Sequence, residues 1–460
     1  EAKGTGRPSE NGLSSPLIVW DTSAENARDD HSSSGTNSFA TRTIMKLFFS
    51  VGEPSGDLHG ANLVRELRQQ DPHIRCVGYG GPRMRQAGCE VHADLTELAV
   101  MWFLQAILNL HRFWGLLVQA DRYFRHQKPD AVILIDYPGF NWWIARRAKA
   151  HGIPVFYYGA PQMWAWAPWR IRKMRRLVDH VLCKLPFEAD WYCERGCHAS
   201  YVGHPYFDEL EQHQVDHSFI QRMNSDSSPL ITLLPGSRTQ EVTSNLSQFM
   251  QVVERIQQRQ PNTRFAIASF NEKQADLAKQ AISAADQSVE VFVGKTPELI
   301  MSATACVACS GSVSLELLYH RKPTVIVYQV SRLAFRVQRY FRKVRYITLV
   351  NLLYSDNRYC SNGELYDPDF EKVPFPEYLT CDDRSPEVAQ QIGHWIESEE
   401  SYAATVANLD ALRSEFAQPG ATQRAAQYIR SNVKSAPTPR VHYFPPEQAG
   451  RSMKQSSEAA

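Results

Sequence analysis

The 460-residue sequence has almost no net charge, because 50 Lys and Arg residues are balanced by 49 Asp and Glu residues. Proteins that coat nucleic acid carry a large basic excess, so this balance argues against a nucleic-acid partner. Long apolar runs are also lacking. The most apolar stretch, 101–118, is interrupted by polar and charged residues and is a poor candidate for crossing a bilayer. The first residues lack a basic region followed by an apolar run, so we expect no secretory signal.

The nine cysteines lack the spacing of a disulfide framework. In a chain of this length they are typical of reduced thiols in a cytosolic protein. One Cys-x-x-Cys pair, Cys306 and Cys309, has no second pair or histidine cluster beside it, and we interpret it as two small buried residues on a strand. We therefore expect no redox or zinc site at this pair.

Composition divides the chain into five segments. The segment 1–44 is rich in Ser, Asn, Gly and Asp, and the segment 434–460 in Pro, Ser and Gln, so both are predicted to be disordered. Between them we predict an N-terminal domain over 45–212, a hydrophilic linker over 213–229, and a C-terminal domain with closing helices over 230–433. The 43% of hydrophobic residues suffices for two cores.

Both domains alternate short β-rich runs with helical stretches. The expected strands are Leu47–Val51, Arg75–Tyr79, Ala131–Ile135, Val155–Tyr158, His180–Leu182, Ser200–Val202, Leu230–Leu234, Arg264–Ala268, Glu290–Val293, Ala305–Cys309 and Thr324–Tyr328. This α/β alternation predicts two doubly wound, Rossmann-like parallel sheets. Such sheets bind ligands at the carboxyl ends of their strands, so two of them predict a cleft between the domains.

Two acidic motifs follow strands of the N-terminal domain. The glycines around Glu53 and Asp57 fit neither the dinucleotide fingerprint nor a Walker loop. These two carboxylates would repel a phosphate, so we expect sugar hydroxyls there; the alternative is a tight turn with Asp57 as a helix cap. Asp136 directly follows the strand 131–135, where a general base belongs, although it could equally cap the next helix.

Two small-residue turns open helices in the C-terminal domain. Gly236, Ser237 and Arg238 suit a phosphate, because backbone N–H groups and a guanidinium can both bind its oxygens; the alternative is a turn with an exposed arginine. The second turn begins a helix that carries Glu316, which we interpret as a ribose ligand, or else as a solvent-facing or an N-terminal-turn glutamate. This second turn consists of Ser310, Gly311 and Ser312.

Basic and aromatic segments indicate a lipid surface. Residues 331–346 hold six basic residues and no acidic one, and at helical spacing the cations and the apolar residues occupy separate faces. The cationic face consists of Arg332, Arg336, Arg339 and Lys343, and the apolar face of Leu333, Val337, Tyr340 and Val344. Residues 168–176 add five cations, and the stretch 101–118 is a second candidate for lipid contact, with burial in the core as its commoner alternative. A basic groove for nucleic acid and a solvated helix face remain the alternatives.

Taken together, these motifs resemble the lipid-A-disaccharide synthase family, whose members are inverting glycosyltransferases of the GT-B fold. The resemblance covers about residues 46 to 430 and rests on ten motifs in family order. They are Gly52–Asp57, Gly80–Met84, Asp94–Met101, Ile135–Asn141, Ala160–Trp166, Leu185–Glu188, Val202–Pro205, Leu234–Arg238, Ser310–Ser312 with Leu315 and Glu316, and Leu349–Leu353.

The resemblance implies that UDP-2,3-diacylglucosamine and 2,3-diacylglucosamine 1-phosphate (lipid X) combine into a β(1→6) disaccharide 1-phosphate with release of UDP. It implies that Asp136 is the base and that Glu53 and Asp57 place a sugar. The implied nucleotide and substrate ligands are Gly236, Ser237, Arg238, Ser310, Gly311, Ser312, Glu316, Asn351, Gln162 and His204. It also implies no metal, and a cytoplasmic enzyme peripherally associated with the inner membrane; a homodimer is left open.

Three positions depart from the family pattern. Trp102 stands where the family has Gly, Gln105 where it has Glu, and Thr380 where it has Gln, which bears on acyl-chain preference and on the donor. The alternatives to this function are another GT-B enzyme, such as one acting on a different lipid acceptor or a UDP-sugar 2-epimerase, and a non-catalytic paralogue. The basic segment 331–346 argues against the epimerase, and Asp136 against the paralogue.

Overall fold

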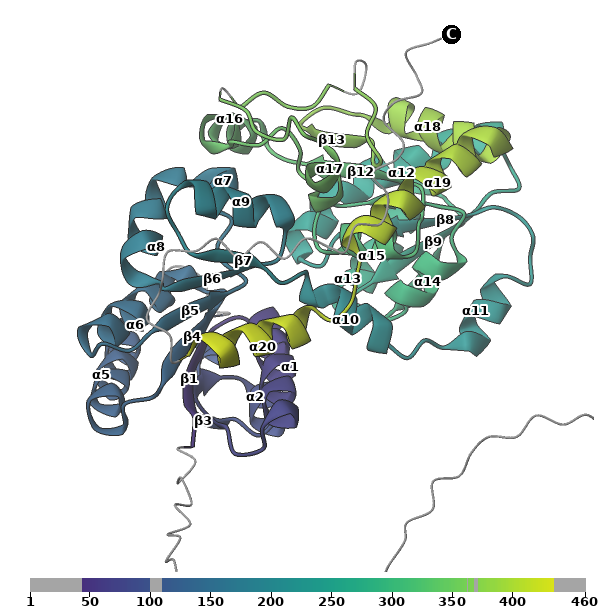
Figure 1. The fold of residues 1–460 in the computed structure, drawn as a ribbon. Coiled ribbons are helices and arrows are strands. Elements are labelled where there is room, and N and C mark those ends of the chain that lie inside the picture. The colour runs from purple at the N-terminus through teal and green to yellow at the C-terminus, as the bar shows by residue number, and fades with distance from the viewer. Residues whose placement is uncertain (1–43, 100–109, 362, 368–370, 434–460) are drawn as a thin grey trace, which may run out of the picture. The chain divides into compact units, whose positions relative to one another are not determined.

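The computed structural model describes residues 44–99, 110–361, 363–367 and 371–433. Within these ranges the chain forms two parallel β-sheets, each covered by helices on both faces (Figure 1). This arrangement confirms the predicted α/β class with two doubly wound sheets. The predicted ends, 1–44 and 434–460, lie outside the described residues except for Ile44.

Seven parallel strands form the first sheet, in the order β3-β2-β1-β4-β5-β6-β7. Their bounds are β1 Lys46–Val51, β2 Arg75–Gly80, β3 Glu90–Asp94, β4 Ala131–Ile135, β5 Val155–Tyr158, β6 His180–Cys183 and β7 Ala199–Tyr201. Alternate side chains face opposite layers, so that Phe48 packs into one core cluster and Phe49 into the other. Burial on both faces explains why the central strands are largely apolar.

The helices of this half are α1 Pro54–Gln70, α2 Pro82–Gln86, α3 Thr96–Ala99, α5 Leu110–Gln127, α6 Pro138–Ala150, α7 Met163–Trp166, the 3-10 turn η1 Pro168–Arg170, α8 Ile171–Leu177 and α9 Pro186–Glu194. Helices α5 to α9 share the core cluster that contains Phe48, and α1 and α2 share the cluster that contains Phe49. Several of these helices begin with proline at the first turn, where its missing N–H costs nothing.

Six parallel strands form the second sheet, in the order β10-β9-β8-β11-β12-β13. Their bounds are β8 Leu230–Leu234, β9 Arg264–Ser269, β10 Glu290–Val293, β11 Ala305–Ala308, β12 Thr324–Gln329 and β13 Glu377–Thr380. The remaining helices are α10 Pro205–Gln212, α11 His217–Met223, α12 Thr239–Arg259, α13 Glu272–Ala285, α14 Thr296–Ser302, α15 Val313–Tyr319, α16 Arg332–Phe341, α17 Leu349–Tyr354, α18 Ser385–Glu397, α19 Glu399–Phe416 and α20 Ala421–Asn432.

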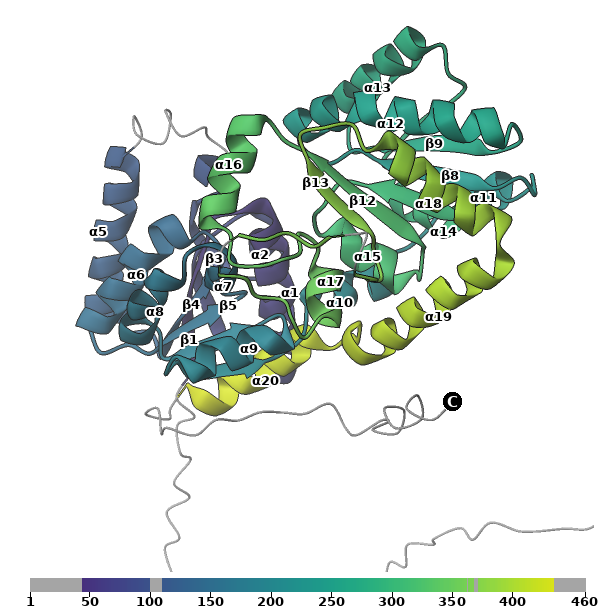
Figure 2. The ribbon, with the colours of Figure 1, turned by 90° about the horizontal axis from the view of Figure 1, so that it is seen from above.

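The last helix does not pack on the second sheet. The predicted C-terminal domain, 230–433, had included it among its closing helices. Ala425, Ala426 and Ile429 of α20 belong to the core cluster of β1 and α1, and α20 lies against α1 (Figure 2). Asp208 of α10 fixes the start of this helix, because its carboxylate accepts the backbone N–H groups of residues 420–422 at 2.6–3.1 Å. We therefore group α20 with the first sheet.

All eleven expected strands are present, with ends that differ by at most one residue. Two further strands, β3 and β13, were not expected. Both are short strands at the edge of their sheet and carry charged or polar residues. β3 is only partly buried, and β13 has polar residues at two of its four positions, so neither sequence has the apolar run by which the central strands were predicted.

Candidate functional site

A pocket of about 390 Å³ lies at the carboxyl ends of five strands of the first sheet. Leu349 of α17, a helix between β12 and β13 in the chain, also lines the pocket. The other lining residues follow β1, β4, β5, β6 and β7: Glu53, Asp136, Tyr137, Pro138, Ala160, Pro161, Gln162, Lys184, Leu185, Glu188 and His204. This is the place at which doubly wound sheets bind ligands, and it brings together Glu53, Asp136, Gln162 and His204 of the predicted site.

Asp136 lies in a strained backbone turn directly after the carboxyl end of β4. Both Asp136 and Tyr137 adopt left-handed backbone conformations, with φ of 46° and 41°, which is uncommon for non-glycine residues, although Lys128, Asp286 and Arg321 also adopt it outside the pocket. The side chains of Asn141 and Tyr157 hold this turn, because both donate to the Asp136 carbonyl oxygen, at 2.8 and 2.6 Å. The alternative of Asp136 as a helix cap is not realised, since Tyr137 occupies the N-cap of α6 and no side chain caps it.

Acidic and basic side chains lie close together around the Asp136 carboxylate. Lys184 Nζ lies 3.5 Å from Asp136 Oδ1. Burial, and to a lesser extent the charge of Asp136, raise the pKa of Glu53 above its usual range, while Lys184 and Arg238 oppose that rise. Lys184 and Tyr157 were not predicted as site residues, and Glu188 appeared only within the family motif Leu185–Glu188. No local motif identifies Lys184 and Tyr157, because only the fold brings them to Asp136.

His204 forms the pocket wall at the start of α10. Its Nδ1 accepts the backbone N–H of Tyr206 at 3.2 Å, which caps the helix. Burial, together with the charge of Lys184, lowers the pKa of His204 well below its usual range. The imidazole is therefore neutral near pH 7, and its second nitrogen carries the proton.

Asp57 does not line the pocket. Its buried carboxylate accepts the backbone N–H groups of Gly81, Arg83 and Met84 at 2.8–3.2 Å and so caps α2. These bonds occupy both oxygens of the carboxylate. The geometry therefore supports Asp57 as a helix cap, with α2 as the capped helix, and does not support a role for Asp57 in binding a sugar.

The predicted phosphate turn follows β8 and opens α12. Gly236 has a φ of 126°, which favours glycine. Arg238 is the N-cap of α12, its side chain is 81% exposed, and it pairs with Glu241 at 3.0 Å. Ser237 accepts a bond from Gln274 through its carbonyl oxygen, at 2.6 Å, which anchors the turn to α13. The exposed guanidinium is thus available to a ligand that can compete with Glu241.

The second small-residue turn lies beside the first, because β11 pairs with β8. Ser310 Oγ donates to the carbonyl oxygen of Ile347 at 2.8 Å, and Gly311 and Ser312 lead into α15. Glu316 is buried and accepts the hydroxyl of Tyr206 at 2.7 Å, while its other carboxylate oxygen has no partner. The alternative of a solvent-facing Glu316 is therefore wrong.

Asn351 is fully buried, and its side chain is engaged within the protein. Its amide nitrogen donates to the carbonyl oxygen of Phe375 at 2.7 Å and to Glu377 Oε2 at 2.9 Å, and its oxygen accepts the Phe375 N–H at 3.1 Å. Thr348 adds its backbone N–H and its hydroxyl to the same Glu377 oxygen, and burial raises the pKa of Glu377 to about 7. This network ties α17 to β13 and engages both the nitrogen and the oxygen of the Asn351 amide within the protein.

The basic helix is shorter than predicted. Helix α16 ends at Phe341, because Lys343 donates its backbone N–H to Ala165 and Val344 pairs with Tyr359 in an antiparallel bridge. Lys343 and Val344 are therefore not part of the two helical faces, and Val344 is buried. The helix itself has no buried residue, and Leu333 and Tyr340 are 73% and 79% exposed.

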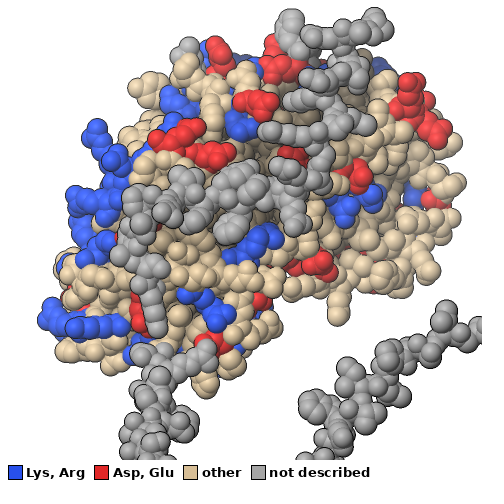
Figure 3. All heavy atoms as spheres, viewed as in Figure 1, with Lys and Arg blue, Asp and Glu red and all other residues tan. Residues whose placement is uncertain are grey.

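Basic side chains gather at the side of the molecule that carries α8 and α16 (Figure 3). The cations of η1 and α8 are exposed, as are Trp166 and Trp169 beside them. The second aromatic candidate, 101–118, lies outside the described residues up to 109. Its remainder begins α5, where Trp114 is 61% exposed. Among the described residues no helix is long and apolar enough to span a membrane.

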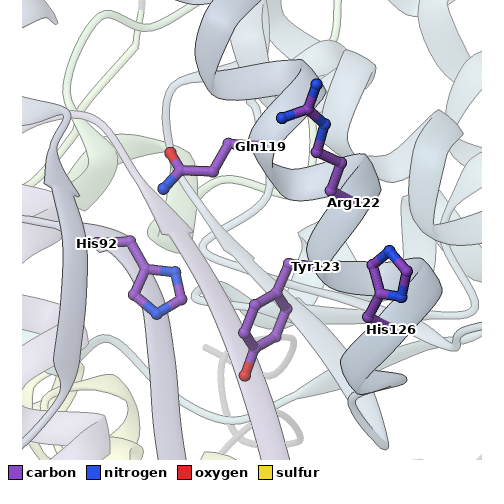
Figure 4. Close-up of a pocket in the computed structure, with 5 residues that line it drawn as sticks. All are labelled: His92, Gln119, Arg122, Tyr123 and His126. Atoms are coloured by element: carbon purple, nitrogen blue, oxygen red, sulfur yellow. The ribbon is translucent and has the colours of Figure 1, made fainter.

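A second hollow, of about 410 Å³, lies between β3 and α5, away from every predicted site residue (Figure 4). Its five lining residues are His92, Gln119, Arg122, Tyr123 and His126. In the described ranges no group of three His, Cys, Asp or Glu residues could hold a metal ion.

Residues 47–360 match the family model of lipid-A-disaccharide synthetase. The chain belongs to this family. It is 30% identical over 393 residues to the lipid-A-disaccharide synthase of Trichlorobacter lovleyi, a match that covers 85% of this chain and 98% of the relative. It is 31% identical over 387 residues to that of Coxiella burnetii, with 84% and 98% covered. The lipid-A-disaccharide synthetase family is one of transferases, so this chain is an enzyme of lipid A disaccharide synthesis.

Solved structures show the fold of this lipid-A-disaccharide synthetase family member. The UDP-GlcNAc 2-epimerase of Neisseria meningitidis bound to UDP-GlcNAc superposes with a TM-score of 0.56 at 12% identity, over 84% of this chain and 100% of that one. The S. aureus MnaA–UDP structure gives 0.55 at 13% identity, over 85% and 97%. The calicheamicin glycosyltransferase CalG4 gives 0.52 at 11% identity, over 85% and 100%. These likenesses confirm the GT-B fold and say nothing further about the reaction.

Proposed function

We propose that this enzyme transfers a 2,3-diacylglucosamine unit from UDP to the 6-hydroxyl of 2,3-diacylglucosamine 1-phosphate, with Asp136 as the general base. The observation that carries the proposal is the position of Asp136 in the pocket, on a backbone turn strained to φ of 46° and fixed by two side-chain donors. A base must be held where it can reach the acceptor hydroxyl, and stored strain of this kind is typical of such positions.

The reaction we propose is a single displacement. The acceptor hydroxyl loses its proton to the Asp136 carboxylate, its oxygen attacks the anomeric carbon, and the bond from that carbon to UDP breaks with inversion. Glu53, Gln162 and His204 line the same pocket and are proposed to hold sugar hydroxyls. The neutral His204 suits this role, because its free ring nitrogen carries a proton to donate.

The departing UDP is proposed to bind at the ends of β8 and β11. There the turns 236–238 and 310–312 lie on neighbouring strands, and both lead into helix N-termini, which favour anions. Glu316 has a buried carboxylate oxygen without a partner, which supports the proposed bond to ribose hydroxyls. The Tyr206 hydroxyl occupies the other oxygen, so a bidentate ribose contact requires Tyr206 to withdraw.

Arg238→Ala is expected to weaken UDP binding by about 1.5–3 kcal/mol, the scale of a hydrogen bond between charged groups. The guanidinium is exposed and pairs only with Glu241 among the described residues, so its removal costs little folding free energy. Isothermal titration with UDP measures the change. Arg259→Ala, at the opposite end of α12, is the control and should bind UDP like the wild type. Equal UDP affinity of both variants would move the nucleotide site elsewhere.

The activity itself is tested with purified protein and the two diacylated substrates dispersed in detergent, by scoring UDP release and disaccharide formation. Release of UDP that depends on both substrates supports the transfer. A product that still carries UDP, with an inverted 2-position, would instead indicate the epimerase alternative. UDP-sugar binding without turnover would indicate the non-catalytic paralogue.

We further propose that the enzyme associates peripherally with the cytoplasmic face of the inner membrane through α16, aided by the cations of α8. Both substrates are lipids, and α16 exposes cations and large apolar side chains together without burying any residue. An amphipathic helix of this composition binds an anionic interface, with its apolar face entering the lipid.

Charge reversal of Arg332, Arg336 and Arg339 to Glu is expected to abolish binding to anionic vesicles and to spare activity in detergent. Each cation near such a surface contributes about 1 kcal/mol, so the loss of three corresponds to a decrease in affinity of at least about 10²-fold. Vesicle sedimentation at low and high salt measures the effect, because salt screens the attraction. Neutral vesicles should bind neither protein.

The matched control reverses three exposed cations on other helices, Arg65, Arg259 and Lys273. It should sediment with anionic vesicles much more strongly than the α16 variant. Equal binding of the two variants would contradict the proposed role of α16. Loss of activity in detergent by the α16 variant alone would instead place its arginines at a substrate phosphate.

A further inference from the structure

Tyr137 directly follows the proposed base and lines the same pocket. Its backbone lies in the left-handed region, with φ of 41° and ψ of 56°, and it occupies the N-cap of α6 without a capping side-chain bond. Both local requirements favour another residue, because asparagine and aspartate tolerate this conformation and also cap helices. Among the described residues, five other than glycine have a positive φ, and Tyr137 is the only aromatic one. The ring is therefore present against the local preference of the backbone.

Gly52, directly after β1, provides the space for this ring. Strand β1 pairs with β4, which places Gly52 beside the turn that follows β4. A Cβ atom at Gly52 would lie 2.5 Å from Tyr137 Cγ and 3.0 Å from Tyr137 Cβ, and closer still to Tyr137 Cδ1. Gly52 itself does not have a positive φ, so what the position requires is the missing side chain and not backbone freedom. Two positions far apart in the sequence thus match each other around one aromatic ring.

The ring of Tyr137 is half-buried between the core and the pocket. It packs against the core cluster that contains Phe48, and it lines the pocket together with Glu53 and Asp136. A fixed aromatic ring beside carboxylates suits a sugar, because the hydroxyl groups donate to the carboxylates while the C–H groups on one face of the pyranose pack against the ring. The steps of the proposed reaction give this ring no role.

We propose that the ring of Tyr137 is the surface on which the pyranose ring of the acceptor packs while its 6-hydroxyl reaches Asp136. This inference rests on the proposed function, in which Asp136 is the base. The base must contact the 6-hydroxyl, and Tyr137 is the next residue along the chain, so the sugar that carries this hydroxyl lies beside the ring. Tyr137 is thus a specificity-determining residue for the acceptor, and Gly52 sets the position of its ring.

The first test compares Tyr137→Asn with Tyr137→Phe in steady-state kinetics with detergent-dispersed substrates, and measures KM separately for the acceptor and the donor. Asparagine suits the left-handed backbone and can cap α6, so the Asn variant should fold, which thermal unfolding checks. Its acceptor KM should rise about tenfold, the scale of an aromatic contact, while the donor KM and kcat change less than about threefold. Phenylalanine keeps the ring, so all three quantities should stay near their wild-type values.

The second test displaces the ring without removing it. Gly52→Ala places a methyl group where the ring now lies, so the acceptor KM should rise as it does in Tyr137→Asn. Gly393 of α18 also lacks a positive φ, but a Cβ atom there would meet no atom within 4 Å, so Gly393→Ala is the control and should have wild-type kinetics. The double variant Gly52→Ala/Tyr137→Asn should raise the acceptor KM no further than Tyr137→Asn alone, because both changes act on one contact.

A wild-type acceptor KM in Tyr137→Asn would overturn the inference, and so would a loss of equal size in Tyr137→Phe. A rise in the donor KM alone, or weaker binding in a UDP titration, would overturn it as well, because the ring would then face the donor sugar or the uracil. A fall in kcat with both KM values unchanged would also contradict it, since Tyr137 would then act only on the position of Asp136.

Asp136→Asn is measured in the same series to separate a failure of this inference from a failure of the proposed function. If Asp136→Asn is inactive and Tyr137→Asn has the wild-type acceptor KM, only the role of Tyr137 is wrong. If Asp136→Asn retains turnover while Tyr137→Asn raises the acceptor KM, the base is misassigned and the contact between Tyr137 and the acceptor stands.

Discussion

Asp136→Asn is expected to lower kcat by about 10²-fold or more and to leave the affinity for UDP-sugar nearly unchanged. Asparagine has nearly the same shape but cannot take a proton from the acceptor hydroxyl. The backbone turn should survive, because Asn141 and Tyr157 bind the carbonyl oxygen of residue 136 and not its side chain. Asparagine also tolerates a left-handed backbone better than most residues. Steady-state kinetics and a UDP titration measure the two quantities.

Asp190→Asn is the matched control, since this carboxylate is exposed on α9 and lies outside the pocket. Its kcat should equal that of the wild type. Near-wild-type turnover of Asp136→Asn would show that another group accepts the proton, and Glu53 would then be the next candidate. A large loss in UDP affinity would instead show that Asp136 acts on the nucleotide.

The central strands could be predicted from sequence, because burial on both faces leaves an unmistakable apolar run. Strands β1, β4 and β8 are of this kind. Strands β3 and β13 could not be predicted, because β3 is only partly buried and β13 places a glutamate and a threonine among its buried residues, so neither has an apolar run. The packing of α20 on the first sheet could not be predicted from the sequence either, since it depends on Asp208 more than 200 residues earlier.

The residues of the candidate site could likewise be predicted only in part. Asp136 and the turn around Gly236 follow predicted strands, so topology alone placed them at ligand-binding edges. Asp57 shows the limit, because a carboxylate in a glycine-rich turn can face a ligand or a helix N-terminus, and only the fold brings the start of α2 to it. Lys184 shows the converse, since nothing in its local sequence predicts a partner 48 positions away.

Asn351 is the position at which family resemblance and geometry point to different roles. The resemblance implied a nucleotide ligand, whereas the side chain bonds to Phe375 twice and to Glu377 once inside the protein. Removal of the amide would leave the Phe375 backbone groups without these partners and the Glu377 carboxylate with one donor fewer. Buried groups without partners cost about 1–3 kcal/mol each.

Asn351→Ala is therefore expected to lower the free energy of unfolding by about 2–4 kcal/mol, and to change the UDP affinity of the folded protein by less than about threefold. Urea unfolding measures the first quantity and a UDP titration below the unfolding midpoint the second. Asn408→Ala, at an exposed position of α19, is the control and should unfold at the wild-type midpoint or slightly above, because alanine favours a helix. Wild-type stability of Asn351→Ala with loss of UDP binding would contradict the structural role, and would show that the amide turns toward the nucleotide when UDP is bound.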